Sequence, residues 1–449
     1  MVATIASAVA QVKVDLAQRI EHHVMEYLAQ HPDWEWRQRL LDPLTTTLLF
    51  TTQVLHGNTA INHLRHLSGM DFTATAYCKA RGRLPLELLQ AVSAGVTGEL
   101  LAESDADGRW RGHQVWRADA TGFSMPDTPE LQQHFGQPGN QLPGCGFPVA
   151  KVLTLCSAAG FITQTLTRPL RTHEASQITA LHDQLQAGDV LVYDRAACSY
   201  AHLSLISRQN LHAIFRMHQK QIVSFRPGRR HARRFRKSRR MGKPKSQWLA
   251  RLGKHDQLVR WFKPAHKPRW MTQEQYEALP ASLVLRELRY RVCRRGYRTR
   301  SVTLVTTLLD PQEYPAAELA EQYLGRWEIE LNFRHLKTTL GMDVLKCQSV
   351  AGVLKELAVF VLVYNLVRLI MLQAARRQKV PLDRVSFVDA LRWLSAARDA
   401  DELLDLILNP KRPGRVEPRV LKRRRKEYDL LTKPRQELRQ ALLKKRLAA

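Results

Sequence analysis

The stretch VLVYDRAACSY, residues 190–200, has the pattern on which the fold prediction depends. Its first four residues are apolar without interruption, which indicates a short strand buried on both faces of a sheet. The strand ends at Asp194, and the segment SYAHLSLISRQ (199–209) then has helical spacing. A buried strand followed by a helix is typical of α/β proteins.

Segments on both sides of this stretch predict further strands. HEASQITALHDQLQAGD (173–189) has helical spacing and precedes the buried strand, and Gly160 separates two apolar runs as in a hairpin. The predicted order is therefore β-β-β-α-β-α-β, which is the order of the ribonuclease-H-like fold. The other predicted strands are HQVWRAD (113–119, ending in Asp119), PVAKVLTLCSAAG (148–160), FITQTLTRPL (161–170) and LHAIFRMH (211–218).

The rest of the chain divides around this α/β core. Residues 219–300 interrupt its rhythm with strand-like runs such as QLVRWFKP (257–264), and the strand RSVTLVTTLLD (300–310) resumes it. Pro315 is expected to open a long helix. The predicted organisation is a helical region (1–110), a first core segment (111–218), a β-rich basic insertion (219–300), the remainder of the core (301–375) and a basic helical C-terminal region (376–449).

Charge points to a polyanionic partner. The chain has 449 residues, a formal charge of +28 and a pI of about 10.3, and nucleic acid is the usual partner of so basic a protein. An anionic membrane is the weaker interpretation, because the apolar run at 354–375 is broken by polar residues and is expected to be a buried helix. The N-terminus is a poor signal peptide, so we expect a cytoplasmic protein.

Two helices with a short turn are predicted within residues 58–85. Asn58 is expected to cap the first helix and Gly69 to end it. Thr73 is expected to begin a second, basic helix that carries Lys79 and Arg81. This layout is that of a helix-turn-helix DNA-binding motif, and an ordinary helical hairpin is the alternative.

A second set of basic residues lies in RPGRRHARRFRKSRRMGKPK (226–245), which holds eleven Lys or Arg and no acid. We expect an exposed loop there that contacts DNA phosphates, and the tail 411–426 has a similar composition. The candidate DNA-binding residues of the loop are Arg229, Arg230, Arg233, Arg234, Arg236 and Lys237.

Three carboxylates are candidates for a metal site. Asp119 and Asp194 each end a predicted strand, and ligands of α/β sheets gather at the carboxyl ends of strands. Glu330 lies on the helical stretch YLGRWEIELNFRHLK (323–337), where a 3.6-residue period places Tyr323, Arg326, Glu330 and Lys337 in one stripe. Converging carboxylates need a cation, and hard cations such as Mg²⁺ or Mn²⁺ prefer oxygen ligands. The alternative is a turn-capping role for each aspartate and solvated charge pairs for the helix.

These residues together resemble the bacterial DDE transposases of the insertion sequence 4 family. RADATGF around Asp119, VLVYDRAACSY around Asp194 and the helix motif Tyr-x2-Arg-x3-Glu-x6-Lys match that family over about residues 111–345. The resemblance implies a ribonuclease-H-like core with a β-rich insertion, and two catalytic Mg²⁺ or Mn²⁺ ions bound by Asp119, Asp194 and Glu330. It further implies that Tyr323, Arg326 and Lys337 hold DNA phosphates.

The resemblance also implies a reaction. The enzyme would act as a homodimer on double-stranded DNA, nick the ends of a transposon, form and open a hairpin, and join the 3′-OH ends to target DNA. Hairpin-forming relatives carry a tryptophan near the position of Val302, and this neighbourhood has none here. Two alternatives stay open: a metal-dependent nuclease or inactive transposase-derived protein, and a non-catalytic basic nucleic-acid-binding protein.

Overall fold

The protein is described here from a computed structural model. The structure describes residues 14–36, 38–172, 176–218, 223–228, 246–291, 301–343, 345–396, 405–410 and 431–447. The basic tail 411–426 lies outside these residues, as do the six basic-loop candidates Arg229, Arg230, Arg233, Arg234, Arg236 and Lys237.

One large mixed sheet organises the chain, with the strand order β4-β3-β2-β5-β6-β10-β9-β8-β7 and the short β1 paired to β2. The neighbours β2, β5 and β6 are parallel, and all other pairs are antiparallel. The predicted order of three strands followed by two α/β units is therefore present. The strands are β1 Arg109–Trp110, β2 His113–Ser124, β3 Val149–Ser157, β4 Ile162–Pro169, β5 Val190–Tyr193, β6 His212–Arg216, β7 Ser246–Gly253, β8 Asp256–Phe262, β9 Ser282–Arg291 and β10 Ser301–Thr306.

The first core strand is longer than predicted. β2 continues five residues past Asp119 to Ser124, because β3 pairs with it along that whole length. Asp119 is thus in the middle of β2, and the expectation that the strand ends there is wrong. The parallel pairing with β5, however, extends only as far as Arg117 and Val192. Asp119 therefore lies where the neighbouring parallel strand is ending.

The predicted β-rich region 219–300 contains β7, β8 and β9. β8 and β9 correspond to the predicted runs, whereas β7 was not predicted from the sequence. β9 pairs with β10 over six residues, so these strands extend the same sheet. A buried ion pair joins two of them: Arg286 of β9 donates to both carboxylate oxygens of Asp256 on β8, at 2.9 and 2.5 Å.

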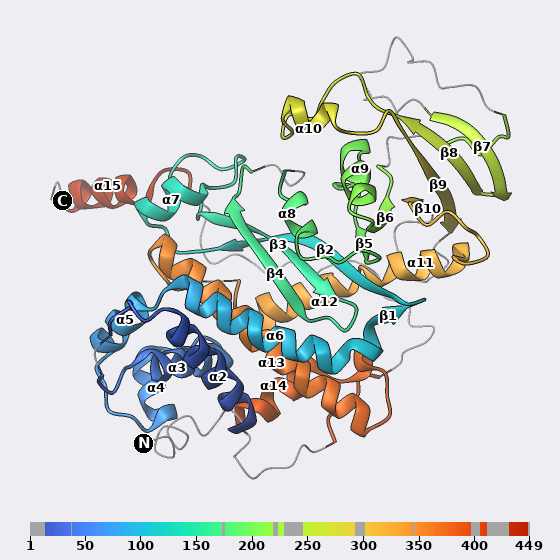
Figure 1. Ribbon diagram of the computed structural model, residues 1–449. Helices are drawn as coiled ribbons and strands as arrows, with labels where there is room; N and C mark the ends of the chain where they lie inside the picture. The colour runs from blue at the N-terminus through green and yellow to red at the C-terminus, as the bar shows by residue number, and fades with distance from the viewer. Residues whose placement is uncertain are drawn as a thin grey trace.

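Helices cover both faces of the central strands. On one face, α11 (Ala316–Gly325) packs through Leu319 and Tyr323 on apolar residues of β2, β5, β6, β9 and β10. On the opposite face lie α8 (Thr179–His182) and α9 (Tyr200–Arg208). Figure 1 shows this division, with α9 above and α11 and α12 below the strands. Burial on both faces explains why β5 has four consecutive apolar residues.

The helix that opens at Pro315 is not continuous. Pro315 is the N-cap of α11, as predicted, but α11 ends at Gly325 and α12 begins at Glu328. α12 runs to Arg334 and continues as a π-helical turn over His335–Thr339. The stripe predicted from Tyr323 to Lys337 assumed one regular α-helix, and this expectation of a continuous helix is wrong.

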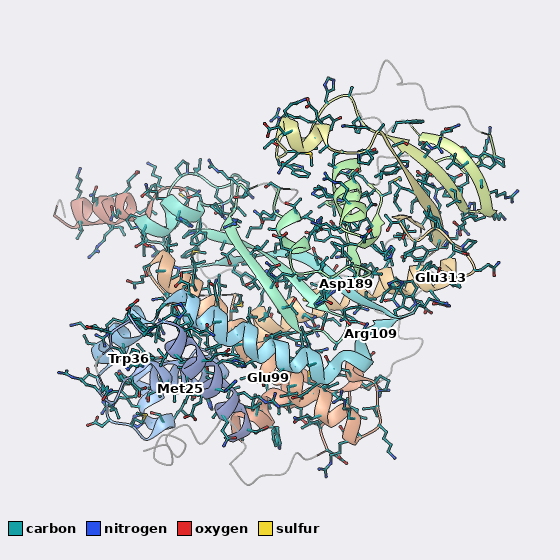
Figure 2. The ribbon with its side chains drawn as sticks, viewed as in Figure 1. Met25, Trp36, Glu99, Arg109, Asp189 and Glu313 are labelled. Atoms are coloured by element: carbon teal, nitrogen blue, oxygen red, sulfur yellow. The ribbon has the colours of Figure 1, made fainter. Side chains whose placement is uncertain are left out.

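The N-terminal region is helical over its described part. It comprises α2 (Val14–Gln30), α3 (Pro43–Leu55), α4 (Ile61–Ser68), α5 (Ala74–Arg83) and α6 (Leu86–Gly108). Glu99 of α6, labelled in Figure 2, accepts hydrogen bonds from Arg19 and His23 of α2, at 2.7 and 2.8 Å. A single hydrophobic cluster runs from these helices through α13 (Val350–Arg377) to β3 and β4. The N-terminal helices thus share their core with the centre of the molecule.

The apolar run near the C-terminal third is a core helix, as predicted. α13 is long and apolar enough to cross a membrane, but 89% of its apolar window is buried within the fold. Asn365 accepts a hydrogen bond from the Ile162 amide of β4 at 2.9 Å, and donates to Thr97 of α6 at 2.8 Å. α6 and α13 lie side by side in Figure 1. The remaining helices are α7 Pro129–Phe135, α10 Gln273–Glu277, a 3₁₀ turn Leu382–Arg384, α14 Phe387–Ala396 and α15 Arg435–Leu447.

Candidate active site

Strand register brings the two candidate aspartates together. Arg117 of β2 lies opposite Val192 of β5, and both strands run in the same direction. Two residues further on, Asp119 is still in β2 and Asp194 is the first residue past β5, so continuing this register brings the two aspartates to the same level. Val115, Val190 and Val192 have the same parity along their strands and belong to the hydrophobic cluster under α11. Since side chains alternate between the faces of a sheet, both aspartates project toward α11 and α12.

Arg326 links the third predicted carboxylate, Glu330, to Asp119. The Nη1 atom of Arg326, between α11 and α12, lies 2.6 Å from Oδ2 of Asp119. Its Nη2 atom lies 3.6 Å from Oε1 of Glu330. Arg326 is only 6% exposed. Burial lowers the pKa of Arg326, but the neighbouring Tyr323, Asp119 and Asp194 raise it by more, so the net pKa is raised. A single charged guanidinium thus lies among all three candidate acids.

The carboxylates do not close around a common centre. No three ligand atoms from Asp119, Asp194 and Glu330 lie within 4.8 Å of one another, and the Glu330 side chain is 62% exposed. Within the described part of the chain, the one such ligand group is His22, His23 and Glu26 on α2. The chemistry of the acids still suits a hard cation, because each offers carboxylate oxygen. The cationic Arg326 neutralises Asp119 in this arrangement.

The other two residues of the stripe flank this centre. Tyr323 is 2% exposed, and its ring centroid lies 5.7 Å from the Arg326 guanidinium carbon. Burial raises the pKa of Tyr323, against the opposing effect of the nearby arginines 326 and 216. Lys337 lies in the π-helical turn, with its ammonium 5.0 Å from the Phe123 ring centroid. Burial lowers the pKa of Lys337, and Asp343 opposes this.

Glu328 and Arg117 explain how α12 is fixed to β2. Arg117 donates to Glu328 at 2.7 Å and to the Ala158 carbonyl at 3.3 Å. Its guanidinium crosses so close to Gly325 that a Cβ atom there would lie 2.4 Å from Nη2. Glycine at this position therefore lets the two helices meet over the end of the strand. Glu328 is engaged in this contact.

Asp189 is a further acid near the centre of the sheet. It precedes β5 and accepts a hydrogen bond from Trp116 Nε1 at 2.7 Å and from the Gln186 amide at 2.9 Å. Figure 2 labels it in the middle of the sheet. It holds the start of the strand, which is a structural role.

In the predicted helix-turn-helix, the end of the first helix and the start of the second are as predicted, but the cap of the first helix is not. Gly69 ends α4 with φ 64°, and Thr73 caps α5 by accepting from the Ala76 amide at 3.1 Å. Asn58, however, does not cap α4, whose N-cap is Ala60. Asn58 donates instead to Glu356 of α13 at 2.5 Å. The cap prediction is wrong because Asn58 ties this region to α13.

The two basic candidates of α5 have different surroundings. Lys79 is exposed. The Arg81 guanidinium points inward, donates to Gln53 at 3.0 Å and to Cys347 at 2.7 Å, and lies 4.3 Å from the Phe50 ring centroid. With its donors directed at these partners, Arg81 stabilises the packing of α5 and is not placed to bind DNA.

Two residues near Arg326 were not assigned to the site from the sequence. Phe215 of β6 lies opposite Tyr193, so the next residue, Arg216, lies beside Asp194. Tyr290 of β9 lies opposite Val302 of β10, where the sequence offers no tryptophan. Single-strand patterns could not reveal either residue, because their proximity depends on register across β6, β10 and β9.

Comparison with known proteins identifies the family of the chain. The family model "Transposase DDE domain" matches residues 110–366, which include all three candidate acids. The transposase InsG for insertion sequence element IS4, from Escherichia coli strain K12, is 26% identical over 386 residues, which is 79% of this chain and 77% of that protein. A cryo-EM structure of the piggyBac transposase synaptic complex with hairpin DNA aligns with a TM-score of 0.39 and 8% identity, over 86% of this chain and 78% of that one.

The matched region begins at the first strand of the sheet and ends inside α13. It covers more than half of the chain and contains the whole motif from Tyr323 to Lys337. The chain belongs to the DDE transposase family, whose members cleave DNA and transfer its strands, and the predicted resemblance to the insertion sequence 4 transposases is confirmed.

Proposed function

We propose that this DNA transposase binds the terminal inverted repeats of an insertion sequence, cleaves them by metal-dependent hydrolysis and transfers the 3′-OH ends to target DNA. One observation carries the proposal: Asp119 and Asp194 follow the paired ends of β2 and β5 on one face of the sheet, where the Arg326 guanidinium lies 2.6 Å from Asp119 and 3.6 Å from Glu330. The strand order and the region 219–300 support a ribonuclease-H-like core with a β-rich insertion.

Asp119, Asp194 and Glu330 would hold two Mg²⁺ or Mn²⁺ ions. Their carboxylate oxygens are the ligands such ions prefer, and a group of acids without a cation repels itself. When bound, a pair of these ions activates the attacking oxygen and stabilises the leaving oxygen of a phosphodiester. The Glu330 side chain is 62% exposed and, among the described residues, is held only by a 3.6 Å contact with Arg326, so it would be free to turn toward a bound cation.

Tyr323, Arg326 and Lys337 would grip the phosphate of the cleaved strand. Arg326 now neutralises Asp119, and it would become free to bind phosphate once cations neutralise the acids. Lys337 forms no ion pair with the described residues, so its charge is available to DNA. Because bound cations would release Arg326 for phosphate, divalent cations and DNA should strengthen each other's binding.

The wider assembly follows the same proposal. The helical region 1–110 would contact DNA through exposed residues such as Lys79, and the basic insertion 226–245 would contact phosphates. A homodimer would hold the two transposon ends, in the cytoplasm of a bacterium and in contact with its nucleoid. The cleavage route through a hairpin belongs to the proposal too, with Tyr290 as the aromatic residue nearest Val302 in register.

Strand transfer is the experiment that tests this function. The purified protein, its own terminal-repeat duplex, a target plasmid and Mg²⁺ should yield covalently joined products. Cleavage without joining would favour a nuclease or a transposase that has lost transposition. Intact DNA at every Mg²⁺ concentration would favour a non-catalytic binding protein.

A further inference from the structure

Arg216 lies in line with the acid pair, on the third parallel strand. The β2–β5 pairing ends at Arg117 and Val192, and the β5–β6 pairing ends at Tyr193 and Phe215. Continuing these registers brings Asp119, Arg216 and Asp194, the first residue past β5, to the same level. Ile214, two residues before Arg216, belongs to the apolar cluster under α11. Because side chains alternate along a strand, Arg216 projects from the same face as the two aspartates.

Arg216 differs from the other arginines of this face in having no partner among the residues that the structure describes. Arg117 is paired with Glu328 and Arg326 with Asp119, both within 2.7 Å. The Arg216 side chain forms no hydrogen bond or ion pair with any residue that the structure describes. It is also partly buried, and an arginine in such a position ordinarily has an anionic or carbonyl partner.

Further donors without acceptors lie around it. The hydroxyls of Tyr290 and Tyr323 and the Nε atom of Arg326 are buried and lack hydrogen-bond partners among the described residues. Burial raises the pKa of Tyr290, with Tyr323 adding to this and Arg216 and Arg326 opposing it. These four residues are therefore close enough to act on one another. All four can donate, and the two arginines cannot accept.

A set of buried donors without acceptors is a site for an anion. We propose that Arg216 and Tyr290, together with Tyr323 and Arg326, bind a DNA phosphate adjacent to the one that is cleaved. The inference rests on the proposed function and adds two residues to the predicted phosphate-binding set. A phosphodiester fits the pocket because its two free oxygens can accept several of these hydrogen bonds and its charge offsets the arginines.

Methylphosphonate scanning provides the test. Each terminal-repeat duplex carries one neutral methylphosphonate in place of a phosphate near the cleavage site. The duplexes are titrated with the wild-type protein and with Arg216→Ala, and Ca²⁺ replaces Mg²⁺ so that binding is measured without cleavage. Wild-type protein should lose about ten- to a hundredfold in affinity at one phosphate that Arg216 contacts. Arg216→Ala should bind the unmodified duplex more weakly by the same factor and lose sensitivity at that phosphate only.

Two conservative variants and one control complete the design. Tyr290→Phe should weaken the response at the same phosphate, and Arg216→Lys should keep part of it. Arg208→Ala removes an exposed arginine of α9, across the sheet from the acids, and should keep the full wild-type pattern. Circular dichroism of each variant checks folding.

The inference is overturned if Arg216→Ala retains the wild-type response at every phosphate. That result is distinct from failure of the proposed function, in which the wild-type protein itself neither prefers the terminal repeat nor cleaves it in Mg²⁺.

Discussion

Glu356 of α13 connects the N-terminal helices to the segment that follows α12 and its π-helical turn. It is 1% exposed, and its carboxylate accepts from Asn58 Nδ2 at 2.5 Å and from the Lys346 and Cys347 amides at about 3.0 Å. Glu356→Ala would leave three donors without an acceptor in a buried position. Each buried donor left unpaired costs about 1–3 kcal/mol. Water that enters the vacated space offsets part of this, so we expect a loss of about 3–5 kcal/mol in the free energy of unfolding.

Two milder variants grade the effect. Glu356→Gln keeps one acceptor oxygen, but its new amide group is a donor and would face one of the three N–H donors. We therefore expect it to lower the free energy of unfolding by about 1–2 kcal/mol. Asn58→Ala removes one of the three hydrogen bonds and should cost a similar amount. Glu437→Ala, at an exposed position of α15, should change the stability by less than about 0.5 kcal/mol.

Urea unfolding followed by tryptophan fluorescence measures these differences. The predicted order of loss is Glu356→Ala, then Glu356→Gln and Asn58→Ala, then Glu437→Ala. A Glu356→Ala protein as stable as Glu437→Ala would refute the reasoning, because it would mean that the three donors find other acceptors at no cost.

Three further predictions concern pH, salt and Arg326. Burial lowers the pKa of His335 to about 4, whereas its pKa in the unfolded state is about 6.5. Between these pH values the unfolded state binds more protons, so the free energy of unfolding should fall as the pH drops from about 6.5 to about 4. His335→Phe should reduce this fall, as measured by urea titrations at pH 7 and 4.5. Replacing Arg229, Arg230, Arg233 and Arg234 by Gln should weaken DNA binding and lower the slope of log K against log salt by about 0.9 per lost phosphate contact, and an unchanged slope would show that the loop does not contact DNA. Arg326→Ala should weaken binding of the terminal-repeat duplex by about tenfold or more, measured by fluorescence anisotropy, and equal affinity would contradict its phosphate role.

The sheet could be predicted because its strands are short, apolar and bounded by polar residues. β5 and β6 were found from uninterrupted apolar runs, and the β3–β4 hairpin from Gly160, whose φ of 84° the turn requires. β7 was missed because SQWLARLG mixes polar and apolar residues, and its burial is intermediate along most of its length. The end of β2 was misplaced because a polar Asp119 in mid-strand looks like a strand end when the pairing of β3 is unknown.

The candidate residues of the site came from the sequence, and their arrangement did not. Predicted strand ends selected Asp119 and Asp194 and a helical period selected Glu330, whereas their relative positions depend on strand register and on Arg326. The break between Gly325 and Glu328 could not be foreseen, because it depends on Arg117 crossing over Gly325 from another strand. Arg81 shows the same limit: its charge suggested DNA, but its partners Gln53 and Cys347 come from distant parts of the chain.

The central claim is that Asp119, Asp194 and Glu330 form the metal-dependent cleavage centre. The most direct test compares Mg²⁺-dependent cleavage of labelled terminal-repeat DNA by the wild-type protein, Glu330→Gln and Glu321→Gln. Glu321 is an exposed acid of α11 and serves as the matched control. We predict that Glu330→Gln binds the duplex with wild-type affinity and loses cleavage by about a thousandfold or more, in the range of a catalytic group, whereas Glu321→Gln cleaves normally. Undiminished cleavage by Glu330→Gln would contradict the account.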